Sequence, residues 1–409
     1  MLGTLEMGPI IRSLTRNKTG AVLIALQIAV TMAIVLNAVF IIGERNDLIA
    51  RVSGVDEANS FQISSTGFAS DFNHMQTLEQ DLLDIRAIPG VVAVTTINAI
   101  PTSGSGWSMS LQTESGENKT DVGTAVYMVD QNGIEALSVE LIAGSNFSEN
   151  EIRYRDGNQE GWPQNIIITK ALANDMFPEL DYAEVVGKTV YINYTEPMQI
   201  IGIIDQLQAP WIGWNKLENA MLSPEHIASG DFSRYFVRTE PGMRDDIMLQ
   251  VEELLAKRAN ERLVEGLRSF EEVRERSYSR HEAMIQILFV VMITLVSITG
   301  KGIVGLASFN VNRRRKQIGT RRALGASKAQ IIRYFMVENF LITTFGIVLG
   351  MAMTMGLNMT LVSVFELGRM NLMYLPLGAI CFWLLGQLAV FGPAIKAAST
   401  PPALATRTV

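Results

Sequence analysis

Four stretches of the chain are apolar on every side of a helix and carry almost no charge. Each reaches or exceeds the roughly 20 residues that a helix needs to cross about 30 Å of hydrocarbon at about 1.5 Å per residue. The first is much longer than the apolar core of a signal peptide, roughly 7–15 residues, so we expect an uncleaved anchor. The four predicted transmembrane helices (TM1 to TM4) are residues 19–43, 283–311, 339–365 and 372–395.

Residues 44–282, between the first two apolar stretches, alternate between strand-like and helix-like patterns. Apolar residues three and four positions apart indicate amphipathic helices, and short β-branched runs bounded by Gly or Pro indicate strands. The predicted helices are 71–87, 170–177 and 244–258, and the predicted strands are 60–64, 91–97, 165–169, 189–193, 198–204, 235–238 and 262–268. Residues 102–108, rich in Gly and Ser, are expected to be a hinge or a loop. The fold class is therefore an α-helical integral membrane protein with four TM helices and a large mixed α/β extracytoplasmic domain inserted between TM1 and TM2.

The helical pattern also continues from this domain into the second apolar stretch. Ser269 and Glu272 have the spacing of a capping box, in which two side chains satisfy backbone N–H groups at the start of a helix. From Ser269 the chain stays compatible with a helix into TM2, and TM1 likewise continues past Gly43 to Val52. These two segments are either a stalk that carries motion to the domain or simple linker helices.

The charges divide the chain into two regions of opposite sign. The sequence is 48% apolar and 18% charged, with a net charge of −7, whereas about a quarter of a typical soluble domain is charged. Residues 44–282 hold 38 acidic and 19 basic residues, and the remainder holds 3 acidic and 15 basic residues. Basic residues mark the cytoplasmic side of membrane helices, so both ends (1–18 and 396–409) and the loop 312–338 are expected in the cytoplasm. The acidic domain and a short turn at 366–371 are then extracytoplasmic, and the acidic balance argues against nucleic acid as a partner.

No residue pattern indicates catalysis, a cofactor or a metal in this chain. Residues 186–189 resemble the end of a phosphate-binding loop, but Tyr182 stands where that pattern requires a glycine, five positions before Gly187. The three histidines are far apart and form no H-E-x-x-H pair. Cys381 is the single cysteine, which excludes an intramolecular disulfide. We therefore predict no catalytic, cofactor-binding or metal-binding residues.

The loop after TM2 is strongly basic, and its sequence from Arg313 to Glu338 is RRRKQIGTRRALGASKAQIIRYFMVE. Gly325 is expected to end one short helix, and Ser327 with Gln330 to cap the start of the next. A short helix at the membrane surface is well placed to contact a cytoplasmic partner. A basic segment lying on anionic lipid accounts for the same charges.

Within this loop, Gln317–Ser327 closely resembles the R-E-I-G-I-R-[KR]-A-L-G-A-[ST] motif of FtsX/MacB-type ABC transporter permeases. In that family the motif follows the second of four membrane helices, which is where it falls here. Pro393–Ala398 is similar to the family's P-A-x-x-A-A ending. Residues 141–147, 165–177 and 186–188 resemble segments of the MacB periplasmic core domain.

The resemblance implies a permease subunit that lies in the bacterial inner membrane with its large domain in the periplasm. It implies that ATP and Mg²⁺ belong to a separate ABC ATPase subunit, and that this chain holds no cofactor. ATP-driven closure would move the periplasmic domain and so export peptides, toxins or amphiphilic compounds, a scheme called mechanotransmission. The residues that the resemblance places at the ATPase are Arg321, Arg322, Leu324, Gly325, Ala326, Ser327, Ile331 and Tyr334.

Other partners follow from the same resemblance. They are the lipid bilayer, a second permease chain, identical or paralogous, along TM1 and TM2, and a periplasmic adaptor with an outer-membrane channel. A lipoprotein-releasing permease has a similar layout and stays an alternative function. A membrane sensor that signals to a kinase is an alternative from another class.

Lys301 departs from the family pattern, in which this position is small or apolar. A lysine at the centre of a membrane costs about 2.5–3.5 kcal/mol unless it is paired or hydrated. We expect it either to pair with Glu338 on TM3 or to extend toward the membrane interface. Gly346 and Gly350 have the G-x-x-x-G spacing of close helix packing, which we expect within one subunit.

Overall fold

The computed structural model describes residues 18–155, 161–227, 231–257, 262–365 and 368–401. The chain divides into two compact units. Residues 1–49 together with 281–409 form the first, here called the helical unit, and residues 50–280 form the second, called the α/β unit. Predictions for residues 1–17, 366–367 and 402–409 lie outside the described residues.

Four long helices build the helical unit, and each is long and apolar enough to cross a membrane. They are α2 (Lys18–Ile49), α8 (Phe270–Arg313), α10 (Lys328–Phe365) and α11 (Tyr374–Ala398), with a short α9 (Arg315–Ala323) between α8 and α10. Three of the four predicted apolar stretches lie inside these helices, and the fourth, 372–395, begins two residues before α11. The helices α8 and α10 begin more than two turns before the predicted stretches do. Charged and polar turns are therefore continuous with the apolar helices, because α-helix propagates cheaply once it has started.

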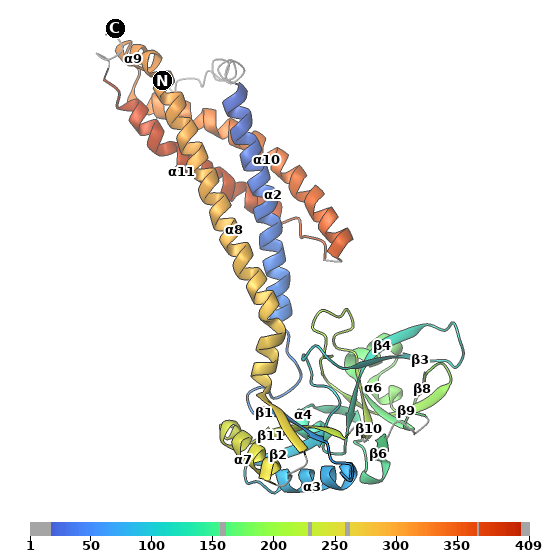
Figure 1. Cartoon of the computed structure of the whole chain (residues 1–409). Coiled ribbons are helices and arrows are strands. Elements are labelled where there is room, and N and C mark those ends of the chain that lie inside the picture. Colours follow the sequence, from blue (N-terminus) through green and yellow to red (C-terminus); the bar gives the residue numbers. More distant parts are fainter. Residues whose placement is uncertain (1–17, 156–160, 228–230, 258–261, 366–367, 402–409) are drawn as a thin grey trace. The chain divides into compact units, whose positions relative to one another are not determined.

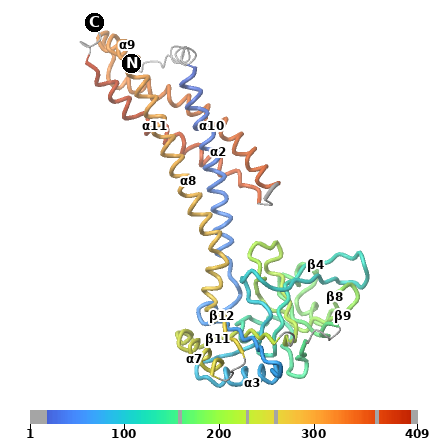
Figure 2. Tube along the Cα trace, in the orientation of Figure 1, coloured from blue at the N-terminus to red at the C-terminus, as the bar shows by residue number. Residues whose placement is uncertain are grey.

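The helices α2, α10 and α11 pack against one another (Figure 2), and glycines lie at their contacts. A Cβ atom added to Gly346 would lie 3.0 Å from the Cβ of Ile28, and one added to Gly350 would lie 3.0 Å from the Sδ of Met32. Gly378 of α11 is equally close to Leu36. The predicted G-x-x-x-G packing face is thus a contact within this chain, where small residues let helix backbones approach.

A four-stranded antiparallel sheet forms one part of the α/β unit. Its strand order is β12 (Arg262–Ser269), β1 (Ser60–Gly67), β11 (Phe232–Thr239) and β2 (Val91–Thr96). Helices α3 (His74–Arg86) and α7 (Arg244–Lys257) cover one face, and their apolar residues share a core with the sheet. The side chain of Asn73 accepts a hydrogen bond from the backbone N–H of Gln76 at 3.1 Å, which sets the start of α3.

The second sheet closes on itself. Its ring of six strands is β4 (Asp121–Val129), β3 (Trp107–Gln112), β8 (Thr189–Ile192), β9 (Glu196–Ile204), β7 (Asn165–Thr169) and β10 (Ala220–Ile227), and β10 pairs back onto β4. Two short strands, β5 (Leu141–Gly144) and β6 (Arg153–Arg155), pair with β9 and β10. The remaining elements are α4 (Gly133–Leu137), the 3₁₀-helix η1 (Glu149–Glu151), α5 (Lys170–Met176) and α6 (Tyr182–Val185).

Strand β4 is buried on both faces and belongs to two cores. Val126 and Met128 pack into the core of the closed sheet, whereas Tyr127 and Val129 pack into a core that includes Phe236 of the four-stranded sheet. The alternation follows from the two-residue period of a strand. The two sheets of the α/β unit therefore share a hydrophobic core.

The predicted strands all lie in strands of the structure, but β3, β4, β5, β6 and β10 were missed. Part of β3 falls in residues 102–108, which we expected to be a hinge or loop. Because both faces of β4 are buried, its sequence lacks the alternation that marks a half-exposed strand. In β10, Pro224 argues against a central strand, but β10 pairs with β7 only at Met221 and Leu222, so that ladder ends before the proline.

Candidate coupling site

A tight turn joins α9 to α10. Gly325 has φ +96°, in the left-handed region that favours glycine. The N–H of Gly325 donates to the carbonyl of Arg322 at 3.2 Å, and the N–H of Ala326 donates to that of Arg321 at 3.0 Å. This is the Schellman pattern of a helix C-terminus. The prediction that Gly325 ends a short helix is confirmed.

The start of α10 is capped as predicted. The hydroxyl oxygen of Ser327 accepts from the N–H of Gln330 at 3.2 Å, and the Gln330 side chain accepts from the N–H of Ser327 at 2.8 Å. The structure differs from the expectation in one respect, because the helix that begins at Lys328 does not stop at the expected loop boundary. It runs to Phe365 as one helix of 38 residues. The exposed turn is therefore the end of a long rigid element, and we call residues 314–338 the elbow.

Buried side chains fix the elbow to the helical unit. Ile318 of α9 lies in the same core as Ile331 and Phe335 of α10. The guanidinium of Arg314 donates to both carboxylate oxygens of Glu338, at 3.0 and 2.9 Å. Both bonds come from Nη1, both partners are largely buried, and a charge-assisted contact of this kind ties the start of α9 to α10.

The pairing expected between Lys301 and Glu338 is wrong. Glu338 is held by Arg314, and Lys301 lies thirteen positions earlier in the chain, about 20 Å along a helix axis. Lys301 is exposed on α8 and forms no ion pair in the described part of the chain. The sequence could not show that Arg314, and not Lys301, is the partner of Glu338. The chain reverses through the short α9, and this reversal brings Glu338 of α10 back to Arg314.

The eight residues expected at the ATPase fall into two groups. Ile331 is buried and Tyr334 is half-buried under the guanidinium of Arg321, at 5.1 Å from the ring centre. Leu324, by contrast, is 83% exposed at the tip of the turn. Gly325 and Ser327 are exposed on either side of the half-buried Ala326, and Arg322 donates to the carbonyl of Ala326 at 3.2 Å. The arrangement presents one large apolar side chain, flanked by arginines, on a rigid support.

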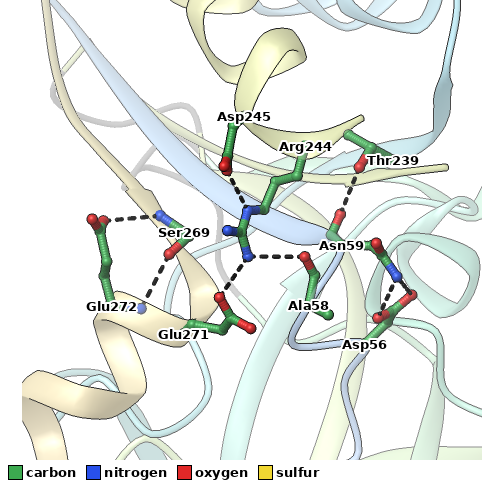
Figure 3. A network of polar contacts seen from close by, with 9 residues as sticks. All are labelled: Asp56, Ala58, Asn59, Thr239, Arg244, Asp245, Ser269, Glu271 and Glu272. Atoms are coloured by element: carbon green, nitrogen blue, oxygen red, sulfur yellow. Dashed lines mark hydrogen bonds and ion pairs between the residues drawn. The ribbon is translucent and has the colours of Figure 1, made fainter. Parts of the chain in front are cut away.

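The start of α8 is a second ordered polar site, shown in Figure 3, and the sequence predicted part of it. The Ser269 hydroxyl accepts from the N–H of Glu272 at 3.1 Å, and the Glu272 carboxylate accepts from the N–H of Ser269 at 3.2 Å. The predicted capping box is confirmed. Because the box ends β12 and begins α8 within one residue, the helix direction is fixed directly at the sheet.

Arg244, which the sequence analysis did not identify, joins three segments at this point. Its guanidinium donates to Glu271 on the first turn of α8 at 2.9 Å, to Asp245 on α7 at 2.9 Å, and to the carbonyl of Ala58 at 2.8 Å (Figure 3). Only 17% of its side chain is exposed. Arg244 therefore holds α8, α7 and the segment before β1 together.

Arg274, one turn further along α8, makes a second set of such contacts. It pairs with Glu57 and donates to the carbonyl of Arg51 at 2.7 Å. Its guanidinium also lies over the ring of Tyr278 at 5.1 Å. We call Arg244, Arg274 and these partners the stalk joint. Local sequence carries no signal for its long-range contacts, since Glu271 and Glu57 lie 27 and 217 positions from the arginines that they bind.

Known proteins match both units of the chain. The family model described as FtsX-like permease C-terminal matches residues 287–402, and the one described as MacB-like periplasmic core domain matches residues 19–254. The macrolide export ATP-binding/permease protein MacB of Chromobacterium violaceum is 22% identical over 299 residues, 69% of this chain and 43% of that protein. The uncharacterized ABC transporter permease YknZ of Bacillus subtilis is 22% identical over 289 residues, 67% of this chain and 65% of that protein.

The chain thus spans less than two thirds of the length of these two relatives. Among solved structures, the periplasmic region of MacB from Actinobacillus actinomycetemcomitans is similar, with a TM-score of 0.33 and 12% identity. That similarity covers 56% of this chain and 97% of the other.

Proposed function

Because this chain belongs to the FtsX-like and MacB-like family of ABC transporter permeases, we propose that it couples ATP hydrolysis by a separate ATPase subunit to motion of its α/β unit. ATP and Mg²⁺ are then bound by the ATPase, and this chain contributes no cofactor. The four apolar helices cross the bacterial inner membrane. Both termini and the elbow are cytoplasmic, and the α/β unit is periplasmic, in agreement with the distribution of basic residues.

The observation that carries the proposal is the exposed Leu324 at the tip of the elbow. A leucine that is 83% exposed costs solvation free energy unless a partner covers it. Arg321 and Arg322 beside it add a charge that an acidic groove on the ATPase would complement. The core of Ile318, Ile331 and Phe335 holds α9 against α10, so Leu324 keeps its position when the partner moves.

Transmission then requires stiff connections from the elbow to the α/β unit. The 38 residues of α10 carry displacement of the elbow into the packed helices α2 and α11. The 44 residues of α8 run without interruption from the last turn before the elbow to the stalk joint. Rigid elements and charge-assisted contacts are the physical basis on which such coupling depends.

A second permease chain, identical or paralogous, covers the apolar surface of α8 in this proposal. Its exposed large side chains include Ile287, Phe289, Val290 and Ile293. An outward-facing apolar helix is equally suited to contact lipid. The second permease chain is therefore proposed from the family resemblance, and the lipid contact is proposed from the apolar surface of α8. Peptides, toxins or amphiphilic compounds are the proposed cargo, with a periplasmic adaptor and an outer-membrane channel as further partners.

Site-specific crosslinking tests the docking surface. In a Cys381→Ala background, Leu324→Cys should crosslink to the ATPase that co-purifies with the chain, while Leu372→Cys, exposed at the other end of α10 and α11, should not. Equal crosslinking at both positions, or none at Leu324, would contradict the proposed docking surface.

Coupling itself is tested by Gly325→Pro. Proline fixes φ near −65°, which is incompatible with the observed +96°, so the turn between α9 and α10 should be lost. We expect the ATPase to remain active but to lose its stimulation by the permease, by about tenfold or more. Charge reversal at Arg321 and Arg322 should have the same effect, and reversal at Arg322 also removes its hydrogen bond to the carbonyl of Ala326. Full export activity in these variants would be inconsistent with a role for the elbow.

A further inference from the structure

A cavity of about 350 Å³ opens in the α/β unit between α3 and the closed sheet. The α3 side contributes Glu79, Leu82 and Leu83, and the other side contributes residues that follow β4, residues near η1 and residues of β6 and β10. This volume is at the lower end of the range for small-molecule sites, about 300–1,000 Å³. The elbow and the stalk joint use none of the residues that line it.

Asp130 is a buried carboxylate on this cavity. It is 2% exposed, and its two oxygens accept from the N–H of Asn132 at 2.9 Å and from the side chain of the same residue at 3.2 Å. In the described part of the chain it forms no ion pair. A buried carboxylate is costly without a cation, so the structure leaves a negative charge that a positively charged group could compensate.

His226 borders the same cavity and is 6% exposed. Its Nδ1 is 2.6 Å from the hydroxyl of Thr96, and across residues 18–155 and 161–227, and the described segments after them, Nε2 has no hydrogen-bond partner. Burial lowers the pKa of His226, against the opposing effect of Asp130 and Glu79, so the ring is neutral at neutral pH. Nε2 therefore offers a polar contact at the cavity wall without adding a positive charge.

Glu79 and Glu149 add two more carboxylates at the more exposed side of the cavity. The phenol of Tyr154 donates to Glu79 at 2.6 Å, and its ring lies 5.2 Å from that of His226. Leu82, Leu83 and Ile152 supply an apolar wall. Arg86 is the one basic residue among those lining the cavity, and it is exposed.

From this arrangement we propose that the cavity binds an ammonium group carried on an apolar stem, such as a lysine side chain. The ammonium lies between Asp130, Glu79 and Glu149, and the aliphatic stem lies against Leu82, Leu83 and Ile152. Three carboxylates against one exposed arginine favour a cation over a neutral or anionic ligand. The binding is a property of the α/β unit and stands whether or not the chain couples to an ATPase.

Binding is measured on the full chain in nanodiscs by saturation-transfer NMR. The probe is Nα-acetyl-lysine amide, and Nα-acetyl-norleucine amide is its neutral match with the same stem. We expect the lysine amide to bind about tenfold more tightly, because a charge contact in a partly desolvated site is worth about 1.4 kcal/mol. Equal binding of the two probes, or equal signals from nanodiscs without protein, would overturn the proposal.

Variants locate the binding in this cavity. Glu79→Gln and Glu149→Gln should each weaken lysine amide binding by about threefold to tenfold and leave norleucine amide unchanged. Asp130→Asn should weaken it at least as much, and its unfolding midpoint shows whether the turn at Asn132 survives. Glu117→Gln, on an exposed loop between β3 and β4, is the matched control and should have no effect. Unchanged affinity in both Glu79→Gln and Glu149→Gln would place the binding elsewhere.

Discussion

The helix α2 belongs to the helical unit, and α8 begins in the α/β unit and continues into the helical unit. The rest of the chain buries the apolar parts of these two helices to very different extents. In their most apolar stretches, 56% of the residues of α2 are buried, against 6% of those of α8. Ala25 and Ala29 of α2 meet the glycine face of α10, whereas α8 presents large side chains such as Phe289 and Phe309 outward.

This difference indicates separate roles for two helices of similar composition. Close packing makes α2 part of a fixed bundle with α10 and α11, because packed interfaces resist sliding. The helix α8 is held by few contacts within the helical unit and by many polar contacts at the stalk joint. We therefore expect α8 to shift more easily than α2 within the bundle, which is what the proposed transmission to the α/β unit requires.

The largest effect is expected from enlarging a residue on the α2 side. Gly350→Leu places new atoms against Met32 and Ala29, which are already within 3.2 Å of an added Cβ. We expect a loss of about 1–3 kcal/mol in the free energy of unfolding, the usual cost of overpacking. Gly305→Leu, on α8, is the matched change, because a Cβ there meets nothing within 4 Å. The measurement is thermal unfolding in detergent. Similar losses in both variants would abolish the contrast between the two helices.

The sequence predicted that α2 and α8 are helical but could not predict their difference in burial. Both contain apolar runs of similar hydropathy, and burial depends on which helix the glycines of α10 face. The G-x-x-x-G spacing identified the face of α10, but not the partner. Conversely, the capping box of Ser269 and Glu272 and the left-handed turn at Gly325 were predictable. Capping and left-handed turns are local and depend on residues three or four positions apart.

The candidate site divides in the same way. Its turn and its cap were visible in the sequence. Of the two expectations for Lys301, the pairing with Glu338 is wrong, because α9 reverses the chain between residues 314 and 338 and brings Arg314 to Glu338. Arg244 could not be found, because Glu271 and Ala58 come to it from segments 27 and 186 positions away. Long-range polar contacts need the fold before they can be predicted.

An intermediate effect is expected at the stalk joint, where α8 is held. Arg244→Glu removes bonds to Glu271 and Ala58 and puts like charges together. We expect stability to fall by about 1 kcal/mol, since the pair is partly exposed, but ATP-dependent export to fall by a larger factor while ATP hydrolysis continues. Adding Glu271→Arg should restore part of the export.

A control for this experiment is the exposed ion pair of Lys119 and Glu114, which lies in the loop between β3 and β4, outside the stalk joint. Reversing that pair should leave both stability and export unchanged. If Arg244→Glu reduced ATP hydrolysis and export equally, or if the double reversal at Arg244 and Glu271 gave no recovery, the stalk joint would be a structural contact without a part in coupling.

The smallest effect is expected where α2 and α8 touch directly. The hydroxyls of Thr31 and Thr299 form a buried hydrogen bond of 2.8 Å, and such bonds between apolar helices contribute about 0.6 kcal/mol. A double-mutant cycle of Thr31→Val and Thr299→Val isolates this coupling from the packing of each valine. A coupling near 0.6 kcal/mol would agree with two helices held loosely together, so that α8 can shift against α2 during each ATP cycle. A coupling above about 2 kcal/mol would instead mean that the two helices move as one body, and the separation of their roles would fail.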